Sequence, residues 1–258
     1  MVFLLGKPPR PSTIFPEVFQ RLEASGAEVT VQLPHDEPVE AGGLTTAGLV
    51  VHRGLDDRAL ALVAGLDSIG VPVCNPLRGT RVTADRAVLA AALTPRWAPA
   101  STVAQTWAEV LELVGSRRCV VKAAHGGGRG SSVLAGTRSE LPADPGTMPP
   151  YVVQEFVPNE GVDHKLYVAG RQVRGLLKPS SLTGGHTSDG EPFEPGAELL
   201  EMARDVGAAL DLHLYGVDVL LGEAGPVVVD VNDFPGYRRI ADAPALVTEH
   251  LADALSLS

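Results

Sequence analysis

Three oxygen-bearing side chains near the C-terminus have a spacing that suits metal binding: Asp218, Asp230 and Asn232. They lie in two apolar segments separated by the turn sequence GEAGP, and this pattern predicts a β-hairpin. A hairpin symmetric about Ala224 places Asp218 opposite Asp230, and it places Leu221 opposite Val227. Directly opposed side chains point to the same face, with Cβ atoms about 5 Å apart. Asn232 shares that face because side chains alternate along a strand.

The opposite face of this hairpin is apolar, and we expect it to be buried: Val217, Val219, Leu221, Val229 and Val231. Like charges that face each other destabilise a hairpin, and a hard cation relieves the repulsion. Carboxylate and amide oxygens suit Mg²⁺ beside nucleotide phosphates. A solvated polar face explains any single aspartate equally well. The trio, followed directly by the rigid turn Phe234-Pro235-Gly236, favours a metal site.

A second candidate site combines a lysine with a glycine-rich loop. Lys122 ends an apolar segment, and residues 126–130 supply glycines before Ser131 and Ser132. Glycine lets backbone N–H groups approach a phosphate, and lysine supplies a point charge for it. A flexible hairpin turn is the simpler explanation of the loop alone. No GxxxxGK[ST] loop occurs, and no GxGxxG opens a helix after a strand, so two common nucleotide-binding motifs are missing.

The composition is that of a globular protein with an acidic balance. Lys plus Arg is 21 and Asp plus Glu is 31, which gives a formal net charge of −10. That balance argues against nucleic-acid or anionic-membrane binding. No apolar run reaches the length of a membrane span and no signal-peptide pattern opens the sequence, so we expect a cytoplasmic protein. The two cysteines, Cys74 and Cys119, are expected to be buried thiols.

The periodicity of apolar residues divides the chain into three expected lobes. Strand and helix patterns alternate over residues 1–93, which predicts an α/β lobe with a parallel sheet. We expect a small lobe over 94–153 and a further lobe over 154–258 that carries the metal site. Thr83 is a plausible N-cap for a helix that begins there. Gly170 is expected at the turn of a hairpin.

Four motifs occur in an order that resembles the ATP-grasp superfamily: Asp85-Arg86, Val120-Val121-Lys122, Gln154-Glu155-Phe156-Val157, and Asp218 with Asp230-Val231-Asn232. The resemblance covers residues 80–240. It implies an α/β (α+β) fold with an N-terminal parallel lobe, a lid lobe and a C-terminal antiparallel sheet. ATP, with one or two Mg²⁺ ions, would lie between the last two lobes.

Two branches of that superfamily share features with the chain. GVDHKLYVAGRQV and DVNDFPGYRRI resemble the inositol 1,3,4-trisphosphate 5/6-kinases, whereas the loop GGGRGSSV is similar to that of the RimK-like ligases. We expect a carboxylate-amine ligase that forms an acyl phosphate. A small-molecule kinase is the alternative, and a nucleotide-binding module without turnover is a third possibility.

The resemblance implies roles for individual residues. Arg86, Lys122, Gly127, Gly128 and Ser131 would contact ATP phosphates, where Arg86 replaces the usual lysine. Backbone groups of Glu155, Phe156 and Val157 would hold the adenine edge, Gln154 would belong to the same nucleotide-binding site, and Asp163 would lie near the ribose. Lys165 and Lys178 would reach phosphates or the acceptor, and the metal ligands would be Asp218, Asp230 and Asn232.

The acceptor is expected to be a small anionic molecule. Lys7, Arg10 and Arg53 end predicted strands of the first lobe, where ligands of α/β sheets gather. Gly236 and Arg238 belong to the rigid turn near the C-terminus. His125 lies beside the glycine loop, and His186 lies in a long polar loop where an ordinary surface role is the better explanation. The sequence leaves the oligomeric state open, including a homo-oligomer.

Overall fold

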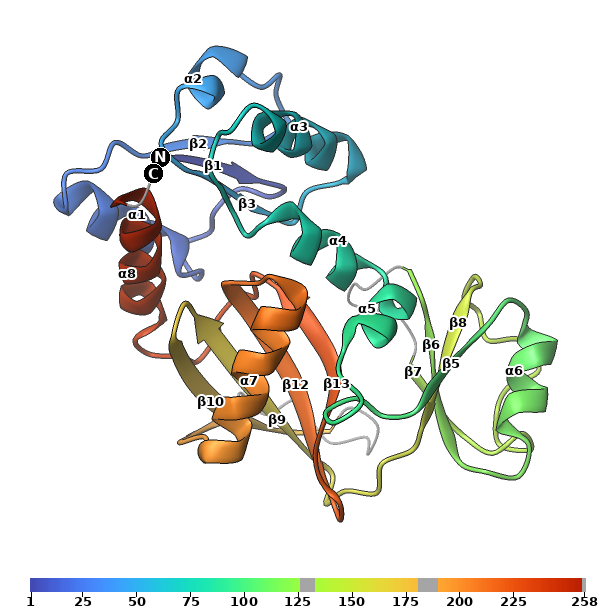
Figure 1. Ribbon diagram of the computed structural model, residues 1–258. Coiled ribbons are helices and arrows are strands. Elements are labelled where there is room, and N and C mark those ends of the chain that lie inside the picture. Colours follow the sequence, from blue (N-terminus) through green and yellow to red (C-terminus); the bar gives the residue numbers. More distant parts are fainter. Residues whose placement is uncertain (126–132, 181–189, 257–258) are drawn as a thin grey trace.

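The computed structural model describes residues 1–125, 133–180 and 190–256, which form three lobes (Figure 1). The first lobe contains a parallel sheet in the order β2-β1-β3-β4. Its strands are β1 (Val2–Leu5), β2 (Thr30–Gln32), β3 (Val50–Arg53) and β4 (Val73–Cys74). The parallel sheet expected for this part of the chain is therefore confirmed.

Helices cover both faces of the parallel sheet because its strands are apolar on both sides. Phe3 and Leu5 pack against α1, whereas Leu4 packs with Val63 of α3. The final helix, α8, also packs beside α1, so the end of the chain completes the core of the first lobe (Figure 1). The helices of this lobe are α1 (Phe15–Ala24), α2 (Ala41–Thr45), α3 (Asp57–Ser68) and α8 (Ala243–Ser256).

Two short helices, α4 (Leu77–Ala84) and α5 (Arg86–Ala92), connect the first lobe to the rest of the molecule. The expected N-cap at Thr83 is wrong, because Thr83 lies inside α4 and its hydroxyl donates back to the carbonyl oxygen of Gly79. Asp85 is the cap of α5 instead. Its carboxylate accepts from the backbone N–H groups of the second and third helical residues at 2.8 and 3.3 Å.

The lid lobe is a four-stranded antiparallel sheet in the order β5-β8-β6-β7, with α6 (Trp107–Val114) packed on it. Its strands are β5 (Ser101–Ala104), β6 (Cys119–Ala123), β7 (Val133–Gly136) and β8 (Tyr151–Glu155). The lobe boundary expected after residue 153 falls within β8, which continues to Glu155 in the lid sheet.

The C-terminal lobe is a five-stranded antiparallel sheet in the order β11-β10-β9-β12-β13, with α7 (Ala197–Leu210) on one face. Its strands are β9 (Val162–Ala169), β10 (Gln172–Pro179), β11 (Glu191–Phe193), β12 (Leu214–Gly222) and β13 (Gly225–Asp233). The hairpin expected around Gly170 is formed by β9 and β10. Among the described residues, no helix is long and apolar enough to cross a membrane.

The β12–β13 hairpin has a β-bulge that the sequence analysis did not anticipate. Gly222 pairs with Gly225 across a two-residue turn, so Leu221 faces Pro226, and the expected pairing with Val227 is wrong. The register then shifts between Asp218 and the next residue of β12, and this shift restores the expected pairing of Asp218 with Asp230. One extra residue on the bulged strand is the defining property of a bulge. The carboxylates therefore face each other although the register near the turn differs from the expected one.

Candidate functional site

One face of the C-terminal sheet carries nearly all of the polar candidates. Lys165 is the cross-strand partner of Asp218, which is in turn the partner of Asp230. Asp163 and Lys178 are also directly opposed, so all five side chains share one face of the sheet. The other face holds Leu166, Val217, Val219, Val228 and Val231, which pack against α7. The period of two therefore separates the candidate chemistry from the core.

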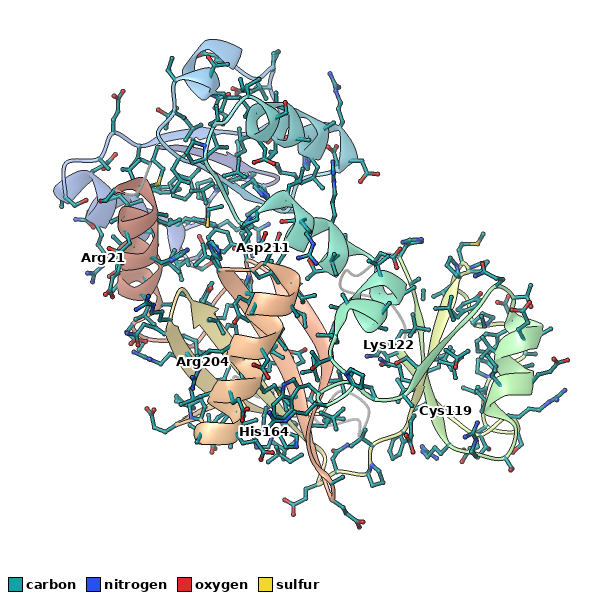
Figure 2. The ribbon with its side chains drawn as sticks, viewed as in Figure 1. Arg21, Cys119, Lys122, His164, Arg204 and Asp211 are labelled. Carbon is teal, nitrogen blue, oxygen red and sulfur yellow. The ribbon has the colours of Figure 1, made fainter. Side chains whose placement is uncertain are left out.

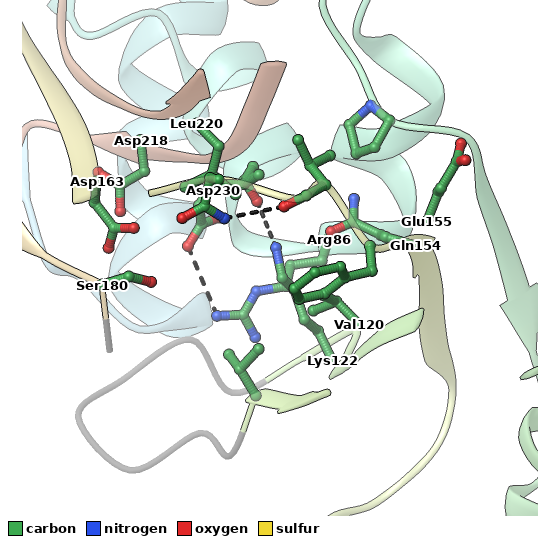
Figure 3. Close-up of a pocket in the computed structure, with 16 residues that line it drawn as sticks. Arg86, Val120, Lys122, Gln154, Glu155, Asp163, Ser180, Asp218, Leu220 and Asp230 are labelled. Atoms are coloured by element: carbon green, nitrogen blue, oxygen red, sulfur yellow. Dashed lines mark hydrogen bonds and ion pairs between the residues drawn. The ribbon is translucent and has the colours of Figure 1, made fainter. Parts of the chain in front are cut away.

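A pocket lies between this polar face and the lid sheet, and we name it the inter-sheet pocket (Figure 3). The lid contributes Lys122 and Gln154, and the C-terminal sheet contributes Asp218 and Asp230. Figure 2 shows Lys122 on the side of the lid that is nearest to the C-terminal lobe. The apolar part of the wall consists of Pro99, Val120, Val133, Phe156, Val157, Leu220 and Val229. The pocket thus combines an apolar wall with a charged one.

The β-bulge shapes this pocket at Val229. The Nζ of Lys122 donates to the backbone carbonyl oxygen of Val229 at 2.5 Å, and this contact joins the lid to the C-terminal sheet. Lys122 is 8% exposed. Burial lowers its pKa, and the nearby Asp230 carboxylate opposes that effect. The expectation that Val229 is part of the buried stripe is wrong, because the bulge turns it into the wall of the pocket.

Three carboxylates and three cations balance one another around the pocket. The Nζ of Lys165 lies 2.6 Å from Oδ2 of Asp218, and Nη2 of Arg86 lies 3.8 Å from Oδ2 of Asp230. Burial raises the pKa of Asp230, and the neighbouring Asp218 raises it further. The pKa of Asp163 is also raised by burial and by Asp218. Crowded carboxylates of this kind are stabilised as anions by a hard cation, so the donor set fits Mg²⁺.

A second cavity of about 590 Å³ lies where the first lobe meets the turn after β13, and we name it the basic pocket. Five cations line it: Lys7, Arg10, Arg53, Lys178 and Arg238. Among the described residues, no aspartate or glutamate lines this cavity. A formal net charge of −10 over the whole chain makes such a local excess of positive charge distinctive. The cavity is therefore suited to an anion.

Arg53 is fixed in the basic pocket by contacts on several sides. Its Nε donates to the carbonyl oxygen of Phe234 at 2.7 Å, and its guanidinium carbon lies 5.6 and 5.9 Å from the ring centres of Phe15 and Phe234. Burial lowers the pKa of Arg53, and the Asp233 carboxylate partly offsets this. A guanidinium stays protonated throughout the physiological pH range even so. It is therefore a permanent, oriented positive charge in the pocket wall.

The structure gathers most of the predicted residues into the two pockets. The inter-sheet pocket is lined by Arg86, Lys122, Gln154, Glu155, Phe156, Val157, Asp163, Asp218 and Asp230. The basic pocket is lined by Lys7, Arg53, Lys178, Gly236 and Arg238. Lys165 contacts Asp218 directly. Asn232 lies two residues after Asp230, on the same face of β13, and its side chain is exposed.

Some predicted residues lie elsewhere. His125 is exposed, its Nδ1 lies 3.7 Å from Oδ2 of Asp85, and it lines neither pocket. The expected place of His125 at the acceptor is therefore not supported by the structure. Gly127, Gly128, Ser131 and His186 lie outside the described residues.

Sequence reasoning missed several wall residues. Ser180 is 4% exposed, lines the inter-sheet pocket and hydrogen-bonds to the Asp163 carboxyl. Its position two residues after Lys178 is a signal that strand alternation could have supplied. Leu220, two residues after Asp218 on β12, had the same signal. Val229 and Asn159 had none, because the β-bulge and a loop turn place them at the pocket.

Known proteins of both expected branches, the inositol kinases and the ligases, are similar in sequence to this chain. Residues 187–253 match the family model described as the inositol 1,3,4-trisphosphate 5/6-kinase ATP-grasp domain. An inositol-tetrakisphosphate 1-kinase 2 from Glycine max is 33% identical over 134 residues, covering 40% of this chain and 42% of that protein. A probable alpha-L-glutamate ligase from Xanthomonas oryzae pv. oryzae is 27% identical over 167 residues, covering 58% and 56%. The chain spans about half the length of these curated relatives.

Solved structures resemble the whole chain. An ATP-grasp RimK domain protein from Sphaerobacter thermophilus has a TM-score of 0.74 at 22% identity and covers 99% of both chains. The D-alanine–D-alanine ligase of Bacillus anthracis has a TM-score of 0.67 at 13% identity, covering 99% of this chain and 96% of that one. The chain thus has the fold of ATP-grasp proteins. It is similar in fold to a RimK domain protein and, over residues 187–253, in sequence to the inositol 1,3,4-trisphosphate 5/6-kinase family model.

Proposed function

We propose that the protein binds ATP and Mg²⁺ in the inter-sheet pocket and transfers the γ-phosphoryl group to an anionic acceptor held in the basic pocket. The observation that carries this proposal is the pairing of Asp218 with Asp230 on a pocket wall that faces Lys122. A structural hairpin gains nothing from two directly opposed carboxylates, because they repel each other. A metal-bound triphosphate is a ligand that would use both the carboxylates and the lysine.

The residues that line the inter-sheet pocket support a position for each part of the nucleotide. The adenine would lie against Phe156, Leu220 and Val229, with backbone groups of residues 155–157 at its polar edge. The ribose would lie near Asp163. Lys122 and Arg86 would contact the phosphates, and both already lie beside Asp230. Buried, oriented cations stabilise developing phosphate charge without reorganisation during the reaction.

Asp218, Asp230 and Asn232 are the residues that would hold Mg²⁺. The ion would neutralise negative charge on the β and γ phosphate oxygens. Lys165, which contacts Asp218, balances the carboxylate cluster and lies between it and the basic pocket. Lys178 lines the basic pocket while its cross-strand partner Asp163 lines the inter-sheet pocket, so the two pockets adjoin across one strand pair.

In the ligase reaction the nucleophile is a carboxylate oxygen of the acceptor. That oxygen attacks the γ-phosphorus, the bond between the γ-phosphorus and the β–γ bridging oxygen breaks, and ADP leaves. The product is an acyl phosphate. An amine nitrogen then attacks the acyl carbon, inorganic phosphate leaves, the amine proton passes to solvent, and an amide remains. The role of Lys178 and Arg238 in this sequence is to bind the acceptor and neutralise its charge, because both line the basic pocket.

A small-molecule kinase is the second candidate, and the match of residues 187–253 to the inositol kinase family model favours it. The nucleophile would then be an alcohol of a polyanionic polyol, and the phosphoryl group would stay on it. The same five cations of the basic pocket suit this acceptor as well. The whole-chain likeness to RimK-like and D-alanine–D-alanine ligase folds supports the ligase as the first choice.

A screen that measures ADP and inorganic phosphate separately tests the proposal. The purified protein is incubated with ATP, Mg²⁺ and either amino acids such as glutamate, small dicarboxylates or inositol phosphates, each with and without an amine. Hydroxylamine is added in parallel to trap acyl phosphates as hydroxamates. ADP release that requires a carboxylate, yields a hydroxamate and liberates phosphate with an amine supports the ligase.

The other outcomes are equally distinct. ADP release without free phosphate, together with a phosphorylated polyol, would support the kinase and reject the ligase. ATP binding without ADP release under any condition would reject turnover and leave a nucleotide-binding module.

A further inference from the structure

A thiol and two imidazoles converge at a place that neither pocket uses. Their ligand atoms, one each from Cys74, His213 and His250, all lie within 4.8 Å of one another. The Sγ of Cys74 lies 3.9 Å from Nε2 of His250. The three residues come from β4, from the connection between α7 and β12, and from α8, so only the tertiary structure brings them together. We call them the Cys74 cluster.

The backbone around the Cys74 cluster is fixed by specific contacts. Asn75 follows Cys74, and its Oδ1 accepts from the backbone N–H groups of His213 at 2.9 Å and Leu214 at 2.8 Å. The backbone N–H of Gly170 donates to the carbonyl oxygen of His213 at 2.9 Å. Figure 2 shows Asp211, two residues before His213, at the seam between the first and C-terminal lobes. The cluster therefore lies on a well-anchored part of that seam.

Gly170 also limits the position of the His250 ring. Its φ of +58° is in the left-handed region, and a Cβ added there would lie 2.8 Å from Nδ1 of His250. Only glycine gives the ring this space without strain. With Nδ1 against the hairpin turn, Nε2 is the ring nitrogen that faces the thiol.

The spacing suits a tetrahedral metal ion. Zinc lies about 2.3 Å from sulfur and about 2.0–2.1 Å from nitrogen, so two such ligands are about 3.5 Å apart. The observed 3.9 Å between Sγ and Nε2 exceeds this by a few tenths of an ångström, which side-chain rotation can close. One sulfur and two imidazole nitrogens select Zn²⁺ or another borderline-soft ion, whereas Mg²⁺ prefers oxygen ligands.

The three residues of the Cys74 cluster differ in their access to solvent. His213 is exposed and lines a cleft of about 570 Å³ at the protein surface. Cys74 is buried, and His250 is half-buried. An ion could enter through the cleft and keep its fourth position open to solvent.

We propose that Cys74, His213 and His250 form a binding site for one Zn²⁺ ion, separate from the Mg²⁺ and ATP site. The ion joins β4 and α8 of the first lobe to the start of β12 in the C-terminal lobe. It therefore locks the seam between these lobes and does not take part in phosphoryl transfer. Binding releases the thiol proton, because the thiolate is the ligand.

Cobalt absorption tests the site directly. Tag-free, full-length protein is titrated with Co²⁺ in the presence of excess Mg²⁺, which occupies oxygen-ligand sites. We expect one Co²⁺ per chain with visible tetrahedral bands and a near-ultraviolet thiolate-to-cobalt band, and we expect stoichiometric Zn²⁺ to abolish both. Zn²⁺ should also raise the thermal midpoint of unfolding.

Matched variants assign the ligands. Cys74→Ser should remove the thiolate band and weaken Zn²⁺ binding at least tenfold, whereas Cys119→Ser, at the other buried cysteine, should change neither. His213→Gln alters an exposed side chain and leaves its backbone contacts intact, so it keeps the test valid if the Cys74 variant does not fold. It should also weaken Zn²⁺ binding at least tenfold.

Absence of the thiolate band, or a band that persists in Cys74→Ser, would overturn the proposal. Unchanged Zn²⁺ affinity in folded His213→Gln would do so too. Because the readout is metal absorption and not turnover, a failure here is distinguishable from a failure of the proposed ATP chemistry.

Discussion

The two adjoining pockets differ in the charges of the side chains that line them. Around the inter-sheet pocket, Arg86, Lys122 and Lys165 lie among three carboxylates, and two ion pairs bring cations and anions into contact. The basic pocket is lined by five cations and, within the described part of the chain, by no carboxylate. The first wall therefore carries charges of both signs, whereas the described lining of the second carries positive charge.

This difference indicates what each pocket selects. Compensated, buried charges are oriented by their partners, so they suit a ligand that brings both signs, such as a metal-bound triphosphate. A larger cavity whose described lining contains cations and no carboxylate selects for negative charge on the ligand itself. Binding of the nucleotide should therefore depend on the positions of individual charged side chains. Binding of the acceptor should depend on the total positive charge of the basic pocket.

The largest effect is expected at the carboxylates. Asp230→Asn removes one charge of the opposed pair while keeping its size, and we expect kcat to fall at least about 1,000-fold, equivalent to about 4 kcal/mol. ADP release under saturating substrates measures it, with circular dichroism to confirm the fold. Asp67→Asn on the surface of α3 is the control. Substantial turnover by a folded Asp230→Asn protein would remove the metal assignment.

The next largest effect should distinguish acceptor binding in the basic pocket from ATP binding in the inter-sheet pocket. Arg238→Gln removes one cation from the basic pocket, and a hydrogen bond to a charged group is worth about 1.5–3 kcal/mol. We therefore expect the KM of the acceptor to rise about 10- to 100-fold while the KM of ATP stays unchanged. Arg239→Gln alters the adjacent arginine, which does not line the pocket, and should leave both values unchanged. An equal rise in both KM values would contradict the division of roles.

Ionic strength gives a smaller and more general test. Screening weakens exposed charges more than buried pairs, and the Debye length falls from about 14 Å at about 0.05 M to about 4 Å at about 0.5 M salt. We expect the KM of the acceptor to rise about fivefold over this range, and we expect the KM of ATP to rise less. Initial rates at several salt concentrations measure both. A stronger response for ATP would reverse the proposed contrast between the pockets.

The smallest effect is expected at the apolar wall. Val229→Ala removes two methyl groups from a half-buried side chain that the bulge turns toward the inter-sheet pocket, which is equivalent to about one fully buried methylene, or about 0.8 kcal/mol. We expect the KM of ATP to rise about fourfold, with the acceptor unaffected. Val227→Ala, on the same strand but outside the pocket, is the matched control. Equal effects of the two variants would show that Val229 has no specific contact with the nucleotide.

The β12–β13 hairpin shows how far local sequence patterns reach. Apolar segments around GEAGP predicted the hairpin, and the opposition of Asp218 and Asp230 is confirmed. The register near the turn was wrong, and Leu221 is 43% exposed where a buried side chain was expected. Alternation cannot reveal a bulge, because an inserted residue depends on how the strand twists against its partners.

The basic pocket shows a different limit. Lys7 and Arg53 were expected at strand ends, and their convergence with Lys178 and Arg238 depends on how the first lobe packs against the C-terminal sheet. That packing is completed by α8, which the sequence analysis assigned to the last lobe but which lies beside α1. His125 was expected near the acceptor because it is close to Lys122 in sequence, and it faces Asp85 instead.

The sequence by itself determined the strand and helix patterns, the ordered motifs and the polar face of the C-terminal sheet. These follow from periods of two and from short-range turns, which neighbouring residues specify. The bulge at Val229, the contact of Lys122 with that bulge, the basic pocket and the Cys74 cluster were decided by tertiary structure. Each joins segments far apart in the chain, and their meeting depends on how whole faces bury apolar surface against one another.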